Sequence, residues 1–257
     1  RFLSVWLTAS VLAATAQQMP RIPFVRNYSA SDYNAQVRNW SVVKDDRGIL
    51  YIGNNRNLLT FDGNQWRKIV INNTIVRSLA LGKNNRVYVG AQGEFGYLAP
   101  DSIGNLRFVS MAAVIPEADR KFSDVYSLHT SGDTLYVHTL FRVFRITGKQ
   151  VESWKTASSY HRSFLIGGRY YLIQERIGLM RLGKNGFQLV PGGERFNNYD
   201  FLSMMVPVNN GKILVGIQRK GLFQFDPAER DPRKAISEFR NESQDYLANN
   251  EIGRAHV

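Results

Sequence analysis

The sequence predicts an all-β fold: a β-propeller of four-stranded antiparallel blades, with about five blades present and the chain ending before the ring closes. Three observations predict it: a short strand that recurs about every forty residues, turn-forming residues between strands, and no long amphipathic helix. One four-stranded unit cannot bury both of its faces, so neighbouring units have to stack around a shared axis.

The recurring strand is rich in aromatic and β-branched residues, which favour extended structure. Its five copies read LYIG at 50–53, VYVG at 87–90, LYVH at 135–138, YYLI at 170–173 and ILVG at 213–216. Their central residues, separated by 37, 48, 35 and 43 positions, are Tyr51, Tyr88, Tyr136, Tyr171 and Leu214. Spacing near forty residues is typical of propeller blades.

Turn-forming residues surround each copy of this strand. It is preceded by DDRG, KNN, SGD, GG or NNG, in which glycine and asparagine supply the positive φ that tight hairpins need. A third strand follows each copy, and in the first four units a further turn leads to an aromatic-bearing fourth strand. The predicted blades span residues 38–69, 75–111, 123–155, 161–191 and 201–240.

The two ends of the sequence predict export and continuation. Arg1, an apolar run over 2–12 and small residues up to Ala16 match a secretory signal peptide that is cut after Ala16. The predicted divisions are a signal peptide at 1–16, a lead-in segment at 17–37, blades one to five at 38–248 and the start of a sixth blade at 249–257.

The composition is that of a basic globular domain. Hydrophobic residues make up 44% of the 257 residues, enough for a sizeable core, and the absence of cysteine excludes disulfide bonds and thiolate metal sites. The formal charge of +12 comes from lysines and arginines scattered among turns, as on a solvated basic surface. Nucleic acid is not an expected partner of an exported chain, whereas an acidic ligand or an anionic membrane surface stays open.

The sequence resembles the two-component regulator propeller repeat at WSVVKDDRGILYIGNNRNLLTFDGNQW (40–66), VYVGAQGEFGYLAPDSIGNLRFVSM (87–111) and GLFQFD (221–226). That repeat builds periplasmic sensor regions of bacterial regulators, especially in Bacteroidetes, and GAQGEFGYL is most similar to sensors that carry a triple-tyrosine domain. The resemblance implies further blades, a triple-tyrosine domain, a membrane-spanning helix and a histidine kinase or helix-turn-helix output module, and it allows a homodimer of the full protein.

Two units depart from the repeat, which usually has glycine where the third strand begins, as at Gly96, Gly178 and Gly221. Asn57 preserves the turn in the first unit, because asparagine tolerates the left-handed conformation. Arg142 does not obviously do so, and a rearranged connector is expected in the third unit.

One end of the propeller is expected to bind the ligand. The links between second and third strands emerge there together with the longer links between blades, and binding residues concentrate on such connections. Arginines and amides beside aromatic side chains suit a polar or anionic small molecule such as a sugar. The predicted ligand-binding residues are Arg77, Gln92, Glu94, Phe95, Tyr126, His161, Arg162, Gln174, Arg176, Gln218 and Arg219. The alternative for each is a structural role in blade ends, and Trp40, Trp66 and Trp154 are expected in inter-blade packing.

No catalytic site, metal site or cofactor is predicted. The four histidines lack metal-ligand spacing, and hairpin chemistry explains the adjacent Asp45 and Asp46. GLMRLGKN at 178–185 nearly matches a phosphate-binding loop, but it lacks the serine or threonine after Lys184 and lies on a strand.

The predicted function is non-catalytic sensing. The propeller would be the periplasmic part of a bacterial regulator that binds an oligosaccharide or other small molecule and signals by a conformational change, with membrane contact only through a helix farther along the protein. Carbohydrate as the ligand follows from the resemblance. Two alternatives stay open: a propeller glycoside hydrolase or polysaccharide lyase using Glu94, Tyr160 and His161, and a protein-interaction scaffold.

Overall fold

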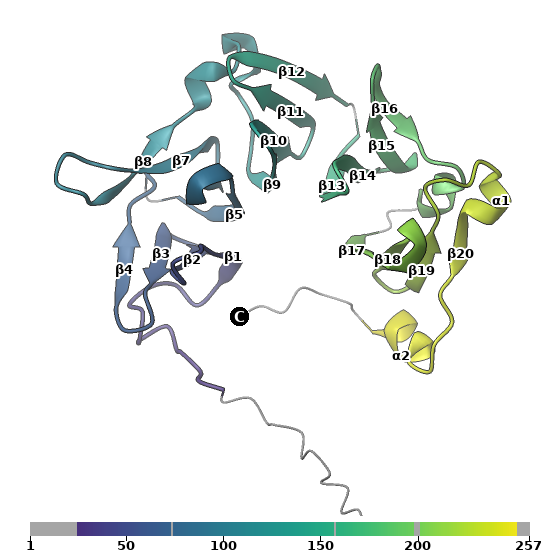
Figure 1. Ribbon diagram of the computed structural model, residues 1–257, viewed down its shortest axis with the longest axis horizontal. Helices are drawn as coiled ribbons and strands as arrows, with labels where there is room; N and C mark the ends of the chain where they lie inside the picture. Colours follow the sequence, from purple (N-terminus) through teal and green to yellow (C-terminus); the bar gives the residue numbers. More distant parts are fainter. Residues whose placement is uncertain (1–24, 73, 157, 198–200, 251–257) are drawn as a thin grey trace, which may run out of the picture.

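Five separate four-stranded sheets make up the structure, a computed structural model that describes residues 25–72, 74–156, 158–197 and 201–250. In every sheet the strands pair in sequence order and antiparallel, as a meander. Figure 1 shows the sheets as an arc of blades around a common centre, with the first strand of each blade innermost. This confirms the predicted fold class.

The twenty strands divide evenly among the blades. Blade one consists of β1 (Asn39–Lys44), β2 (Leu50–Asn54), β3 (Leu58–Phe61) and β4 (Trp66–Ile69). Blade two consists of β5 (Val76–Leu81), β6 (Val87–Ala91), β7 (Glu94–Pro100) and β8 (Leu106–Ser110). Blade three consists of β9 (Val125–Ser131), β10 (Thr134–Thr139), β11 (Arg142–Thr147) and β12 (Gln150–Lys155).

Blade four consists of β13 (Tyr160–Ile166), β14 (Arg169–Gln174), β15 (Gly178–Gly183) and β16 (Gly186–Leu189). Blade five consists of β17 (Leu202–Pro207), β18 (Ile213–Ile217), β19 (Gly221–Phe225) and β20 (Ile236–Glu238). The helical turns are short: η1 (Lys83–Asn85), η2 (Ala112–Val114), η3 (Glu117–Asp119), η4 (Gly193–Phe196), η5 (Asn209–Gly211), α1 (Pro232–Ala235) and α2 (Gln244–Asn249).

The hairpin between β1 and β2 shows why these turns form where the sequence predicts them. Gly48 adopts φ +86°, and the buried carboxylate of Asp45 accepts hydrogen bonds from the backbone N–H of Arg47 at 3.0 Å and of Ile49 at 2.9 Å. An aspartate that bonds the backbone of its own turn stabilises the reversal. Asp45 is therefore a turn residue and not half of a catalytic pair.

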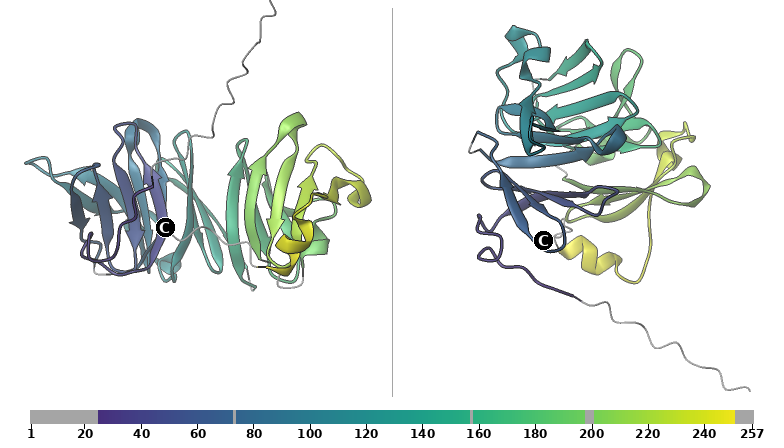
Figure 2. Two further views of the ribbon diagram at one scale, coloured as in Figure 1. Left: turned by 90° about the horizontal axis from the view of Figure 1, so that it is seen from below. Right: turned by 60° about the vertical axis from the view of Figure 1, so that its left-hand side comes forward.

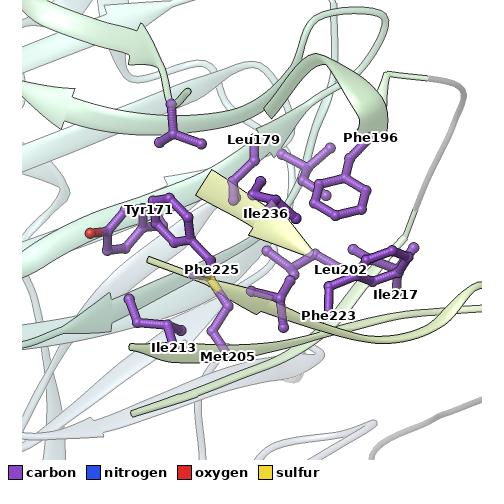
Figure 3. Packing of buried hydrophobic residues seen from close by; sticks show 13 residues of the cluster. Tyr171, Leu179, Phe196, Leu202, Met205, Ile213, Ile217, Phe223, Phe225 and Ile236 are labelled. Carbon is purple, nitrogen blue, oxygen red and sulfur yellow. The ribbon is translucent and has the colours of Figure 1, made fainter. Parts of the chain in front are cut away.

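The hydrophobic core lies between neighbouring blades. Residues next to each other on a strand point to opposite faces, so Leu79 packs toward blade one while Ala80 packs toward blade three. Figure 3 shows the interface of blades four and five, where Tyr171 and Leu179 meet Phe223 and Phe225. Burying each such side chain stabilises the fold by about 1.5–3 kcal/mol, which holds the blades in radial order.

The two ends of the arc are covered by terminal segments. Tyr28 and Tyr33 pack against Trp66 on blade one, with ring centroids 5.4 and 5.3 Å apart, and α2 packs against β19 on blade five. The predicted signal peptide lies outside the described residues, as do residues 251–257 of the predicted sixth blade. In the described part of the chain, no helix has the length and apolar character needed to cross a membrane.

Candidate functional site

The innermost strand of every blade contains a β-bulge near its beginning. In β1 the register moves from Asn39 opposite Asn54 to Ser41 opposite Gly53, and equivalent shifts occur in β5, β9, β13 and β17. A bulge inserts an extra residue and re-aims its side chain, and bulges are frequent next to binding sites. The inserted positions are Trp40, Arg77, Tyr126, residues 161–162 and Ser203.

These bulges lie at the end of the propeller that was predicted to bind the ligand. In blades one, two, four and five, the residue after the second strand donates its N–H to the carbonyl of the residue before the innermost strand, as Gln92 does to Ile75 at 3.1 Å. Figure 2 shows the strands running between the two ends of the propeller, so the loops gather at those ends. The bulge residues and the second-to-third-strand loops therefore share one end, near the axis.

Serines close to the bulges of blades one, two and four bond residues of a neighbouring blade. Ser41 Oγ accepts a hydrogen bond from the N–H of Leu79 at 3.2 Å, and Ser78 Oγ donates to the carbonyl of Val125 at 2.8 Å. His129 Nε2 and His138 Nδ1 each lie 3.0 Å from Ser163 Oγ. Both histidines thus bridge blades three and four.

Arg77 is the centre of the most built-up cluster at this end. Its guanidinium carbon lies 4.2 Å from the ring centre of Trp40 and 5.5 Å from that of Tyr126, while Nε donates to Asp124 Oδ2 at 2.5 Å. Cation–π contacts and a charged hydrogen bond fix the guanidinium plane in a site where its side chain is 20% exposed. Side chains from blades one, two and three thus meet at one arginine.

The cluster leaves hydrogen-bonding capacity unused by the protein. Arg77 Nη1 and Nη2 donate to no acceptor among the described residues, and neither nitrogen is buried. The Oδ1 atom of Asp124 is buried and accepts no hydrogen bond from the described residues. A buried carboxylate oxygen without a partner is costly inside a protein, whereas the unburied Nη nitrogens are open to water or to a bound molecule.

Arg162 forms a smaller counterpart across blades four and five. Its guanidinium carbon lies 4.8 Å from the ring centre of Phe201, and Nη1 donates to the carbonyl of Ser203 at 3.3 Å. Tyr160 and His161 precede it in β13, but their side chains lie outside those that the structure describes.

Other predicted residues make local contacts at the same end. Glu94 Oε1 accepts from the N–H of Phe95 at 2.9 Å and from Ser110 Oγ at 2.8 Å, and Gln174 Nε2 donates to Thr156 Oγ1 at 2.6 Å. These bonds fit the structural alternative for Glu94 and Gln174. The remaining predicted residues lie on the loops; Gln92, Arg176 and Arg219 are exposed there, and Gln218 is half-buried.

Phe95 requires a correction. It is fully buried between blades two and three, with Ile115 and Phe144, and cannot contact a ligand at the surface. The link between β6 and β7 contains only Gln92 and Gly93, so β7 starts at Glu94 and its next side chain points into the blade interface. The phenyl ring is a core residue.

The connector of blade three is rearranged, as the sequence predicts. Arg142 adopts no left-handed conformation, and its Nη1 lies 2.7 Å from Asp119 of η3 and 3.0 Å from Ser153 Oγ. The ion pair holds the long connection 111–124 against blade three. That connection ends at Asp124, so this pairing also helps to position the Arg77 cluster.

A hollow of about 400 Å³ lies at the opposite end, among the hairpins of blades two and three. Its cations already have partners: Lys83 pairs with Asp133 at 2.9 Å, and Arg86 lies 4.8 Å from the ring centre of Tyr97. In the described part of the chain, no group of three or more histidine, aspartate and glutamate side chains could hold a metal ion.

No protein-family model and no curated protein matches the sequence. Among solved structures, the chain is similar to virginiamycin B lyase from Staphylococcus aureus, at 12% identity and a TM-score of 0.56 over 82% of this chain and 72% of that chain. It is also similar to the extracellular domain of a hybrid two component system from B. thetaiotaomicron, at 17% identity and a TM-score of 0.50. That match covers 85% of this chain and 36% of the other.

A third similar structure is YCF48 bound to D1 peptide, at 14% identity and a TM-score of 0.55 over 78% of this chain and 68% of that chain. At these identities the likenesses establish the propeller fold. Because they include an enzyme, an extracellular domain of a two component system and a peptide-bound protein, the fold alone does not select the function.

Proposed function

We propose that this chain is an extracytoplasmic sensor domain that binds a small carbohydrate at the bulge-bearing end of the propeller. The observation that carries the proposal is the Arg77 cluster: a guanidinium held by Trp40, Tyr126 and Asp124 with two donor nitrogens unused. A fixed donor beside an exposed aromatic ring is the arrangement that proteins use to orient a polar ligand.

The propeller supports binding better than chemistry. The hydrolase alternative needs Glu94, but Oε1 of Glu94 accepts hydrogen bonds from the N–H of Phe95 and from Ser110 Oγ. The Asp124 carboxylate bonds Arg77 through Oδ2 and its Oδ1 is buried, so it is committed to holding the arginine. A paired arginine beside aromatic rings can bind and orient a ligand. A ligand that contacts three blades favours one packing of these blades over another.

Signalling then follows from differential affinity. A ligand that contacts blades one to three favours the blade arrangement in which Trp40, Arg77 and Tyr126 are stacked, and it shifts the equilibrium by the difference in its affinity for the two arrangements. Likeness to an extracellular domain of a two component system supports a periplasmic sensor in a longer regulator.

A thermal-shift and calorimetry screen of the purified protein against neutral, amino and acidic oligosaccharides tests the proposal. We expect at least one saccharide class to raise the melting temperature, since binding to the native state stabilises it in proportion to ligand concentration over Kd. Turnover of a bound glycan would instead identify an enzyme. Binding of no saccharide would reject the sensor proposal and favour the interaction scaffold.

A further inference from the structure

We propose that the ligand of this site is an acidic saccharide whose carboxylate is bound by the Nη1–Nη2 edge of Arg77. This inference rests on the proposed function and names its ligand class. This edge is available to a ligand because Nε already donates to Asp124. Both Nη nitrogens are unburied and donate to no acceptor among the described residues.

The geometry of the arginine suits a carboxylate. Two N–H groups along one guanidinium edge match the two oxygens of a carboxylate, which gives bidentate hydrogen bonds with directional specificity. Trp40 at 4.2 Å and Tyr126 at 5.5 Å hold the plane, so little side-chain entropy remains to be lost when the ligand binds.

The charges around Arg77 favour an anion over a neutral hydroxyl pair. Asp124 pairs with Arg77, and the guanidinium carbon of Arg38 lies 5.1 Å from the Trp40 ring centre, so a second arginine stands beside the cluster. Arg38 is exposed and forms no ion pair in the described part of the chain. Arg38 therefore adds a positive charge without an ion-pair partner beside Arg77, which favours an anionic ligand.

Trp40 and Tyr126 have different roles at this site. The Trp40 ring is occupied by arginine, and its Nε1 donates to Asn55 Oδ1 at 3.1 Å, so it supports the guanidinium. The Tyr126 side chain is at the surface, with 36% of the residue exposed, and offers a flat apolar surface to the C–H groups of a sugar ring. A uronic acid residue presents a carboxylate and such a ring together.

The test compares saccharides that differ only in the acid group. Calorimetry of the purified protein would use trimers of galacturonate, glucuronate and mannuronate and the methyl ester of each. A trisaccharide that carries sulfate but no carboxylate would be added as a second anion. We expect one uronate trimer to bind at least tenfold more tightly than its methyl ester. R77K should weaken that binding at least tenfold because lysine offers no bidentate edge, and Y126A should weaken it several-fold.

R145K is the matched control, because Arg145 also stacks on a tryptophan and pairs with a carboxylate but lies on the outer strands of blade three. It should leave binding unchanged. Ester discrimination by the wild-type protein needs no variant, so it decides the question even if R77K folds poorly. Binding of the methyl esters as tightly as the uronates overturns this inference while the sensor proposal survives. Tighter binding of the sulfated trisaccharide overturns the carboxylate assignment. Binding of none of these saccharides overturns the acidic-saccharide inference, and the wider screen with neutral and amino oligosaccharides then decides the sensor proposal.

Discussion

The molecule contains the same three-part arrangement in two places. At the axial end, Arg77 stacks on Trp40 and bonds Asp124; on the outer strands of blade three, Arg145 lies 5.3 Å from the ring centre of Trp154 and bonds Glu152. Both join a guanidinium, an indole and a carboxylate. The two differ in where their members come from and in what they leave unused.

The outer arrangement is local, and two of the three guanidinium nitrogens contact the carboxylate. Arg145 and Glu152 are direct partners on the adjacent strands β11 and β12, and both Nε and Nη2 of the arginine bond the same carboxylate oxygen. Burial lowers the pKa of Arg145, but the hydrogen bond and charge of Glu152 more than offset this, so the pKa lies above its ordinary value. With Glu152 54% exposed, this is a cross-strand surface pair.

The inner arrangement is long-range and incomplete. Arg77 and Asp124 are 47 residues apart, their side chains are 20% and 10% exposed, and only Nε is bonded. The same three groups thus stabilise a β-hairpin on the outer strands, whereas at the axial end three blades assemble them and leave the Nη1–Nη2 edge of the arginine open.

The largest effect should come from Asp124→Ala. The change leaves the Arg77 charge partly buried and unpaired, so we expect a loss of about 3 kcal/mol in the free energy of unfolding, measured by urea denaturation. Glu152→Ala serves as the outer control. Equal losses for the two variants would contradict the distinction drawn between the two arrangements.

Gly90→Ala should be the next most disruptive change. Gly90 lies opposite Ser78, beside the Arg77 bulge, and an added Cβ would meet Val125 Cγ1 at 2.6 Å and crowd Ser78 Oγ. Forcing a methyl group into this contact should cost about 2 kcal/mol and displace the bulge. Denaturation measures the cost, and unchanged affinity for the ligand would show that the bulge does not position Arg77.

The fold could be predicted because the sequence of each blade contains its own strand and turn signals. The strands around Tyr51, Tyr88 and Tyr136 are short, and their hairpins carry glycine and asparagine, so period and turn chemistry define a blade without knowledge of its neighbours. The stacking of blades then follows from the two faces that each sheet must bury.

The site was predicted only in part because it is made by stacking between blades. Arg77 and Tyr126 belong to the predicted set and come together, whereas Asp124 carries no signal, being a lone aspartate at the end of a long connection. A recurrent serine one residue after Trp40, Arg77 and Tyr126 is the one pattern that could have indicated the bulges. The prediction that Phe95 binds the ligand was wrong because the side on which each side chain of β7 lies depends on where the strand begins. The length of the preceding loop sets that point, and residue propensities do not reveal it.

Asp45→Asn should give a smaller effect that depends on pH. Burial would raise the pKa of Asp45, but hydrogen bonds from Arg47 and from the N–H of Ile49 outweigh it and hold the pKa below its ordinary value of 3.8. A depressed folded pKa means that the carboxylate stabilises the fold above that value and loses this contribution as the pH falls through the folded pKa. We expect a loss of about 1.5 kcal/mol near neutral pH. In urea denaturation, the difference between variant and wild type should shrink below pH 3.8, and a constant difference would contradict the assignment.

The smallest effect should come from the outer pair itself. Replacing Arg145 and Glu152 by alanine singly and together gives a double-mutant cycle, and we expect a coupling energy below about 1 kcal/mol, because the exposed Glu152 is well solvated before and after folding. Raising the salt concentration should reduce that coupling further, since exposed charges are screened. A cycle for Arg77 and Asp124 should keep most of its larger coupling at the same salt concentration. An outer coupling energy equal to the inner one and unaffected by salt would contradict this distinction. Burial between three blades would then not explain why the Arg77 cluster differs from the Arg145 pair.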